Sequence, residues 1–156
     1  MRKRAIFLMA GLCALAAATP ASAELGGPPA LPANDATRVT TVSTLWTAAR
    51  VPYTVYQTTF ADGMIVKEYA AQAGNVFAVA WNGTVNAPLG LLLGAYLPCY
   101  QQAINAAMAG GESVTAGLYV QQSGLAIWVA DAPGHITGRV YLPQALPGGM
   151  DAALIN

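Results

Sequence analysis

Three short segments with the composition of β-strands, separated by two glycine-containing turns, constrain the fold of this chain more than any other feature. Residues 53–60 and 64–69 are rich in Tyr, Thr and Val. The Asp-Gly pair at 62–63 is typical of a β-hairpin, because glycine tolerates the positive φ of such turns. A second turn follows at 73–75, and residues 76–81 (VFAVAW) are apolar throughout. A strand with one solvated face would alternate, so we expect residues 76–81 to form a central strand covered on both faces.

A broken helix is predicted directly after this meander. Residues 89–93 open a short apolar helix that Gly94 ends. Residues 98–108 form a second helical piece, which begins with proline and stops at the glycine pair 110–111. Such a broken apolar helix can cover one face of the sheet.

The second half of the chain returns to strand patterns at residues 117–122, 125–130 and 136–142. In the last of these, Gly138 interrupts the inward-facing row, which predicts a bulge or a close backbone approach. We therefore expect an α+β fold, namely an antiparallel β-sheet meander of about six strands with a broken helix inserted between strands three and four. The third strand in this prediction is residues 76–81.

Residues 37–48 are compatible with two structures. Their Thr and Val content favours a strand, whereas Asn34 or Asp35 could cap a helix that places four apolar residues at helical spacing. Those four residues are Val39, Val42, Leu45 and Trp46.

The first 23 residues have the three parts of a secretory signal peptide. Residues 2–4 are basic, residues 5–18 form an uninterrupted apolar run, and residues 21–23 are an Ala-Ser-Ala cleavage site. The run is shorter than the ~20 residues that a membrane-spanning helix needs. We expect cleavage after Ala23, export to the periplasm or the medium, and no transmembrane segment in the mature chain.

The mature chain divides into two parts. Residues 24–36 are rich in glycine and proline and cannot hold a helix or a central strand, so we expect an extended arm there. Residues 37–156 are expected to form a single α+β domain, and its tail is rich in proline and glycine from about residue 143.

Charge argues against nucleic acid as a partner. The chain has seven basic and seven acidic residues, and three of the basic ones lie in the signal peptide, which leaves a net charge of −3. The four remaining cations, Arg38, Arg50, Lys67 and Arg139, are scattered along the sequence. Phosphate and anionic lipid are bound by clustered cations, so neither is expected as a partner.

The chain has few of the residues that usually bind metals or cofactors. Cys99 is the only cysteine after signal cleavage, so no intramolecular disulfide can form, and the thiol is either buried or free to pair between chains. His135 is the only histidine, which excludes a zinc site of the usual composition, and no loop has the spaced acidic residues of a calcium site. We predict neither a metal nor another cofactor.

No nucleophilic catalytic constellation is complete. Ser123, Asp131 and His135 are the residue types of a serine triad. However, Ser123 and His135 lie at opposite ends of the strand at 125–130, about 20 Å apart, and a nucleophile must contact its base. Nothing in the surrounding sequence supports a Cys99–His135 pair either.

Carboxylates offer the weakest route to an enzyme. Asp62 is expected to serve its own turn, and Glu68 to lie on a solvated strand face, with its neighbour Lys67 on the opposite face. A hydrolase that uses Glu68 or Asp131 is therefore the last of the functional hypotheses, and an enzyme is not the expected class.

Aromatic side chains are the remaining candidates for a binding site. Core and cross-strand packing is the simpler explanation for those on strands. The alternative is a pocket or an interaction face for an apolar molecule or a polymer. The candidate binding surface consists of Tyr56, Tyr69, Trp81, Trp128 and Tyr141.

Three stretches together resemble one known family. They are LGGP at residues 25–28, YTVYQTTFADGMIVKEYAAQAGNVFAVAWNG at 53–83 and GRVYLPQALPGGM at 138–150. They are similar to the exported proteobacterial proteins grouped as domain-of-unknown-function family 2844, although Lys67 stands where Arg is expected and residues 98–115 match poorly. The resemblance implies a signal peptide, one small domain and a Gram-negative host, and it implies no activity.

These observations lead to one functional hypothesis and two alternatives. We expect an exported, periplasmic or secreted, non-catalytic protein that binds a partner or belongs to an envelope assembly. The first alternative is a carrier that holds a small apolar ligand between helix and sheet, and the second is the hydrolase. An unpaired sheet edge would favour the partner-binding protein, and a concave apolar pocket would favour the carrier. The partner and the oligomeric state are not specified by the sequence.

Overall fold

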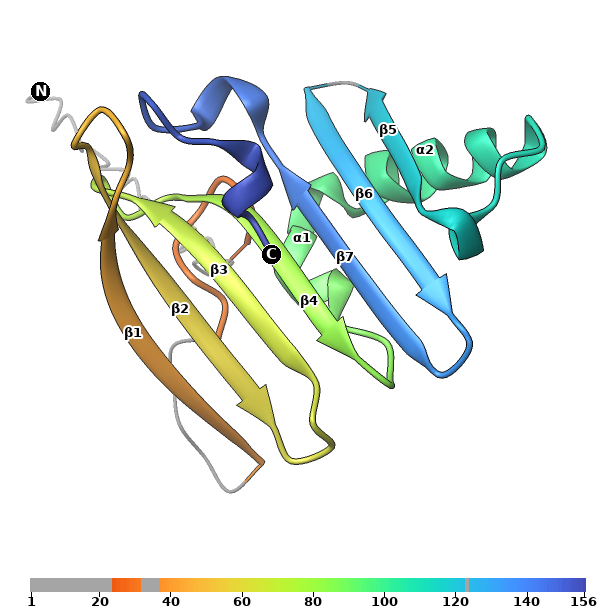
Figure 1. The fold of residues 1–156 in the computed structure, drawn as a ribbon, viewed down its shortest axis with the longest axis horizontal. Coiled ribbons are helices and arrows are strands. Elements are labelled where there is room, and N and C mark those ends of the chain that lie inside the picture. The colour runs from red at the N-terminus through yellow and green to blue at the C-terminus, as the bar shows by residue number, and fades with distance from the viewer. Residues whose placement is uncertain (1–23, 32–36, 123) are drawn as a thin grey trace, which may run out of the picture.

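The computed structural model describes residues 24–31, 37–122 and 124–156, so the predicted signal peptide lies outside the described residues. Within them the chain forms an antiparallel sheet of seven strands in the order β1-β2-β3-β4-β7-β6-β5 (Figure 1). The strands are β1 (Arg38–Trp46), β2 (Pro52–Phe60), β3 (Ile65–Ala71), β4 (Val76–Gly83), β5 (Leu118–Gln122), β6 (Leu125–Ala132) and β7 (His135–Tyr141).

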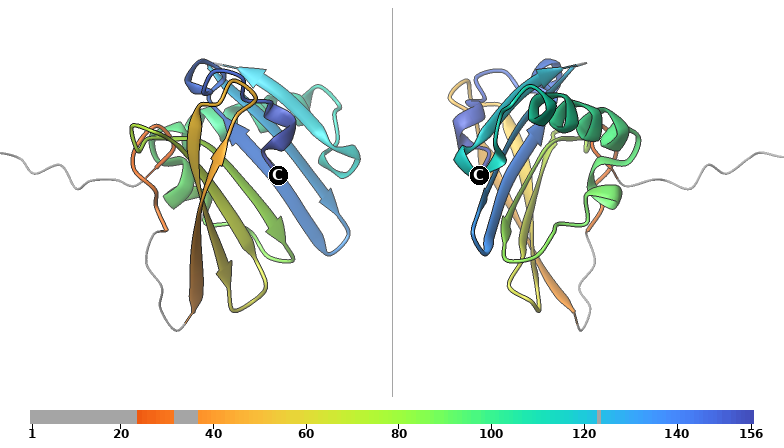
Figure 2. Two further views of the ribbon diagram at one scale, coloured as in Figure 1. Left: turned by 60° about the vertical axis from the view of Figure 1, so that its left-hand side comes forward. Right: turned by 90° about the vertical axis from the view of Figure 1, so that its right-hand side faces the viewer.

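The broken helix lies between β4 and β5. It consists of α1 (Leu89–Leu93), the 3-10 turn η1 (Gly94–Tyr96) and α2 (Leu97–Ala109). Gly94 has a φ of 47°, which separates the two helical pieces as the sequence predicts. The helices cover the rear face of the sheet in Figure 1, and Figure 2 shows α2 running across that face. No helix of the described residues is long and apolar enough to cross a membrane.

Three further 3-10 segments complete the described structure: η2 (Val114–Ala116), η3 (Pro143–Ala145) and η4 (Ala152–Leu154). The first lies just before β5. The other two belong to the tail after β7, which folds back in front of the sheet (Figure 1).

Our prediction of about six strands with the helix between strands three and four is wrong. The sheet has seven strands, and the helix follows the fourth. The difference comes from residues 37–48, where Arg38–Trp46 pairs with β2 along its whole length. Five of its nine residues are β-branched, and a full cross-strand ladder outweighs the helical spacing of its apolar residues.

Two meanders meet at the centre of the sheet. Strands β1 to β4 follow one another as hairpins, and β5 to β7 return so that β7 pairs with β4. All residues from Val76 to Trp81 are buried, and β4 has paired neighbours on both sides. This confirms the prediction of a central strand covered on both faces, and it leaves β1 and β5 as the two edges.

The helix-side face holds the larger hydrophobic core. The Trp81 ring meets Tyr100 of α2 edge to face, with centroids 6.4 Å apart, and it lies over Gly138, where a Cβ atom would overlap it. Of the two alternatives predicted at Gly138, the structure shows a close approach, made by the Trp81 ring, and not a bulge, because the strand register through Gly138 is regular. Other buried members of this core are Leu25, Leu31, Val66, Val79, Leu92, Leu93, Ile127 and Val140.

A smaller core forms on the opposite face, under the C-terminal residues. Ile155 is fully buried there against Tyr53, Tyr69 and Phe77. The tail therefore covers part of a sheet face that the helices leave open (Figure 1).

Candidate functional site

The five aromatic residues predicted as a binding surface lie on two different faces of the sheet. Tyr56 and Trp81 belong to the helix side, where Trp81 is buried. Tyr69 and Tyr141 belong to the opposite core, and Trp128 lines a hollow beside the C-terminal residues. The sheet therefore does not bring these five side chains together into one surface.

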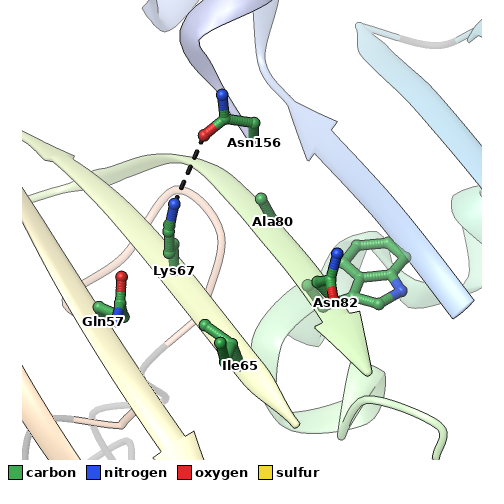
Figure 3. A pocket seen from close by; sticks show the side chains of 7 residues that line it. Gln57, Ile65, Lys67, Ala80, Asn82 and Asn156 are labelled. Atoms are coloured by element: carbon green, nitrogen blue, oxygen red, sulfur yellow. Dashed lines mark hydrogen bonds between the residues drawn. The ribbon is translucent and has the colours of Figure 1, made fainter. Parts of the chain in front are cut away.

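A shallow groove of about 400 Å³, lined by both polar and apolar residues, lies on the face that carries the C-terminal residues (Figure 3). The side chains labelled around it are Gln57, Ile65, Lys67, Ala80, Asn82 and Asn156. Lys67 Nζ donates to Asn156 Oδ1 at 3.4 Å. A neighbouring hollow of about 280 Å³ shares Asn82 and Asn156 and continues to Trp128 and Arg139.

The groove and the neighbouring hollow combine a largely apolar floor with a few polar side chains. Amides and the cation Lys67 line the groove, Arg139 lines the hollow, and no acidic side chain is among the lining residues of either. Such a surface can meet hydroxyl or carboxylate groups. It offers neither a nucleophile beside a base nor a set of metal ligands.

Arg139 and Tyr69 fasten the C-terminal residues to the sheet. Arg139 Nη1 donates to the Ile155 carbonyl at 3.0 Å, and its guanidinium carbon lies 5.5 Å from the centroid of Trp128. Tyr69 Oη donates to the Asn156 carbonyl at 3.0 Å and accepts from the Asn156 N–H at 3.1 Å. Burial raises the pKa of the Tyr69 phenol, so Tyr69 remains a protonated donor at neutral pH.

Glu68 is a buried anchor, and our prediction that it lies on a solvated strand face is wrong. Its side chain is 1% exposed, and its two carboxylate oxygens accept the backbone N–H groups of Ala30 (2.6 Å) and Leu31 (3.0 Å). Burial raises the pKa of this carboxyl above 4.5, while the two N–H donors lower it by a smaller amount. The strand period offers a signal for the burial of Glu68, although not for its partners, because the apolar residues Val66 and Ala70 share its face.

The other polar residues considered for catalysis remain dispersed. Asp62 Oδ1 accepts a backbone N–H at 3.0 Å within its own turn, which confirms its predicted role. Asp131 and His135 are exposed near the β6–β7 turn, and Ser123 lies outside the described residues. Cys99 is a half-buried free thiol packed against the helix-side core. In the described part of the chain, no group of His, Cys, Asp and Glu could hold a metal ion.

Strand β1 presents an exposed apolar surface at one edge of the sheet. Four of its side chains are large, apolar and open to solvent: Val39 (59% exposed), Val42 (59%), Leu45 (44%) and Trp46 (64%). We call these four residues the edge surface. Val42 and Trp46 lie on one face of β1, and Val39 and Leu45 lie on the other, because side chains alternate along a strand. Sequence reasoning noted these residues only as a possible helical stripe, although β1 has no charged residue after Arg38.

The backbone of β1 is open along the second half of its outer side. Ala61 N donates to the Thr37 carbonyl and Thr47 N donates to the Val51 carbonyl, so odd-numbered residues of β1 bond to β2. The even-numbered residues direct their N–H and C=O groups away from β2. For Val42, Thr44 and Trp46, the described chain supplies no partner for these outward groups.

The first half of β1 is held by the segment that precedes it. Thr40 Oγ1 donates to the Leu31 carbonyl at 2.9 Å, and Thr58 Oγ1 of β2 reaches the same carbonyl at 3.2 Å. Arg38 and Thr40 take part in further interactions. The open stretch of the edge is therefore residues 41–46.

Of the comparisons with known proteins, the one with protein families gives a match. No curated protein and no solved structure shows a significant match to this chain. Over residues 21–155 the chain matches the family described as protein of unknown function, DUF2844. The match takes in every helix and strand described above, including the stretch at 53–83 that carries the resemblance. The chain therefore belongs to the DUF2844 family.

Proposed function

We propose that this protein is exported, is not an enzyme, and binds a partner protein through the open edge of strand β1. The observation that carries the proposal is the edge surface, whose four large apolar side chains lie on an edge strand of nine residues. Native sheets protect such edges with charge, proline, bulges or a covering element. After Arg38, β1 has neither a charge nor a proline, and its register with β2 is regular.

The expected binding mode is strand addition. An extended segment of the partner would bond to the outward N–H and C=O groups of Val42, Thr44 and Trp46, and its side chains would cover the apolar ones of β1. Main-chain bonds supply affinity in this mode, and the side chains on both faces supply specificity.

The N-terminal residues support the exported address. Residues 1–23 have the basic, apolar and small-residue regions of a signal peptide, and the charge of −3 that remains after cleavage disfavours nucleic acid and anionic membranes. A periplasmic or secreted location is consistent with a surface poor in charge that is meant to meet another protein.

The carrier of a small apolar ligand is the second candidate. The space between helix and sheet is occupied by packed side chains such as Leu92, Leu93 and Ile127. A hollow of about 230 Å³ remains beside Tyr100 and Met108. That volume lies below the ~300 Å³ at which ligand pockets usually begin, so partner binding is the better supported function.

Site-directed photo-crosslinking tests the proposal. The full chain is expressed in a Gram-negative host with p-benzoylphenylalanine at Val42, and a matched sample carries it at Tyr119, which is 53% exposed on the other edge strand, β5. We expect a discrete adduct from position 42 that Thr44→Pro abolishes, because proline removes an outward N–H. Equal labelling from both positions, or no adduct from position 42, would overturn the proposal.

A further inference from the structure

We infer that the strand added to β1 is β1 of a second copy of this chain, antiparallel and related by a two-fold axis at Thr44. The inference rests on the proposed function, since it names the partner of the same edge. The two copies would form one continuous sheet, joined where each leaves its backbone unpaired.

The open backbone groups select the register. Only Val42, Thr44 and Trp46 combine an outward N–H and C=O with freedom from other partners in the described chain. A two-fold axis at Thr44 pairs Val42 with Trp46 of the second copy, Thr44 with Thr44, and Trp46 with Val42. A register centred on Val42 would instead place the second copy beside Arg38 and Thr40, where the Thr40 hydroxyl already donates to the Leu31 carbonyl and both residues have further interactions.

The side chains of β1 are complementary to themselves in this register. Val42 and Trp46 share a face, so each Trp46 would cover Val42 of the other copy, and an aromatic residue opposite a β-branched one is a favourable cross-strand pair. On the other face, Leu45 would lie opposite Ser43 of the second copy. Both kinds of pair remove apolar surface from water, because the side chains of Val42, Leu45 and Trp46 are 44–64% exposed in the single chain.

Charge is compatible with the contact. No residue from Val39 to Trp46 is charged, so two copies meet without a like-charge pair in the paired stretch. Arg38 lies six residues from the axis, about 20 Å along the strand, and is held by its own chain. A charged peptide would find no counter-charge between residues 39 and 46, whereas the same stretch of a second copy is as free of charge as the first.

The proposed contact between two copies is small, so we expect the dimer to be weak. Three backbone pairs and two kinds of side-chain pair, each present twice, fall at the low end of interface sizes, where association is weak and transient. The dissociation constant of the dimer should therefore lie in the micromolar range, and association must be measured up to high protein concentration.

Sedimentation velocity of the exported protein purified from periplasm, from about 1 μM to about 500 μM, gives the first test. We expect the wild type to shift from monomer to dimer across this range, and Thr44→Pro and Val42→Lys each to weaken association at least tenfold. Two variants are used because proline can disturb the strand itself, whereas lysine keeps the backbone. A wild type that stays monomeric throughout would overturn the inference.

A disulfide tests the register directly. In a Cys99→Ser background, Thr44→Cys should form a covalent dimer under oxidising conditions, because hydrogen-bonded antiparallel pairs place Cα atoms about 5.5 Å apart. The matched variant Tyr119→Cys should remain monomeric. Equal crosslinking of the two variants would contradict the register.

The photo-adduct at Val42 separates this inference from the proposed function. An adduct of twice the chain mass supports both. An adduct of another mass, with a monomeric wild type, would overturn the second-copy inference while partner binding at β1 survives. Absence of any adduct would overturn both.

Discussion

The two edges of the sheet are built differently, although each is the first strand of its meander. Strand β5 has five residues, lies against α2 and is preceded by η2, and Tyr119 is its exposed aromatic residue. Strand β1 has nine residues and carries the four exposed apolar side chains of the edge surface. Short length and a covering helix are two devices that protect sheet edges. The protein has them at β5 and lacks them along half of β1, and the proposed contact at β1 rests on this difference.

The protected half of β1 depends on Glu68, and removing this side chain should have the largest effect. Glu68→Ala leaves the buried N–H groups of Ala30 and Leu31 without acceptors, which should lower the free energy of unfolding at neutral pH by about 3 kcal/mol. Urea denaturation measures the change. Glu112→Ala, an exposed acid, serves as the control and should stay within about 0.5 kcal/mol of wild type. A loss below about 1 kcal/mol for Glu68→Ala would show that Leu31 holds β1 without help from Glu68.

The buried carboxyl of Glu68 should also make the free energy of unfolding depend on pH, with a sign opposite to that of an ion-paired acid. Because burial raises the pKa of Glu68 in the folded state, the folded protein binds this proton more tightly than the unfolded chain does. The stability that protonation contributes is fully present below the unfolded pKa near 4.5 and is lost as the pH rises through the folded pKa. The gap in unfolding free energy between wild type and Glu68→Ala should widen on acidification from neutral pH. A gap that narrows would contradict the role of desolvation.

Proline substitutions at two adjacent positions of β1 distinguish the N–H groups that bond to β2 from those that point away from it. Ser43→Pro removes an N–H that bonds to β2 and should cost about 2 kcal/mol of unfolding free energy. Thr44→Pro removes an N–H that points outward and should cost less than about 1 kcal/mol, because edge strands tolerate proline there. Thermal and urea unfolding of the two variants, side by side, give the comparison. Equal losses would mean that the outer side of β1 is not open.

The smallest effects on stability are expected at the exposed aromatic residues of the two edges. Trp46→Ser and Tyr119→Ser replace side chains that are 64% and 53% exposed, so each should change the unfolding free energy by no more than about 0.5 kcal/mol. Association measured by sedimentation should fall for Trp46→Ser alone. Loss of association in both variants, or in neither, would remove the distinction between the edges.

Local sequence chemistry was sufficient to predict most of the elements. The Asp-Gly turn at 62–63 and the interruption of the helix at Gly94 depend on the positive φ of a single glycine, and the close approach at Gly138 depends on its missing Cβ atom. The burial of 76–81 follows from an apolar run without alternation. Each of these properties is decided within a few residues, which is why the sequence alone determines it.

Only the tertiary structure determined that residues 38–46 form a seventh strand, that Glu68 is a buried hydrogen-bond acceptor, and that half of β1 is left uncovered by the described chain. Residues 37–48 carry both a strand composition and a helical spacing, and pairing with β2 selects the strand. Glu68 finds its donors 37 and 38 residues away, and no local pattern announces them. Whether β1 stays open depends on what the rest of the chain covers, and burial of backbone groups is settled only when distant segments meet.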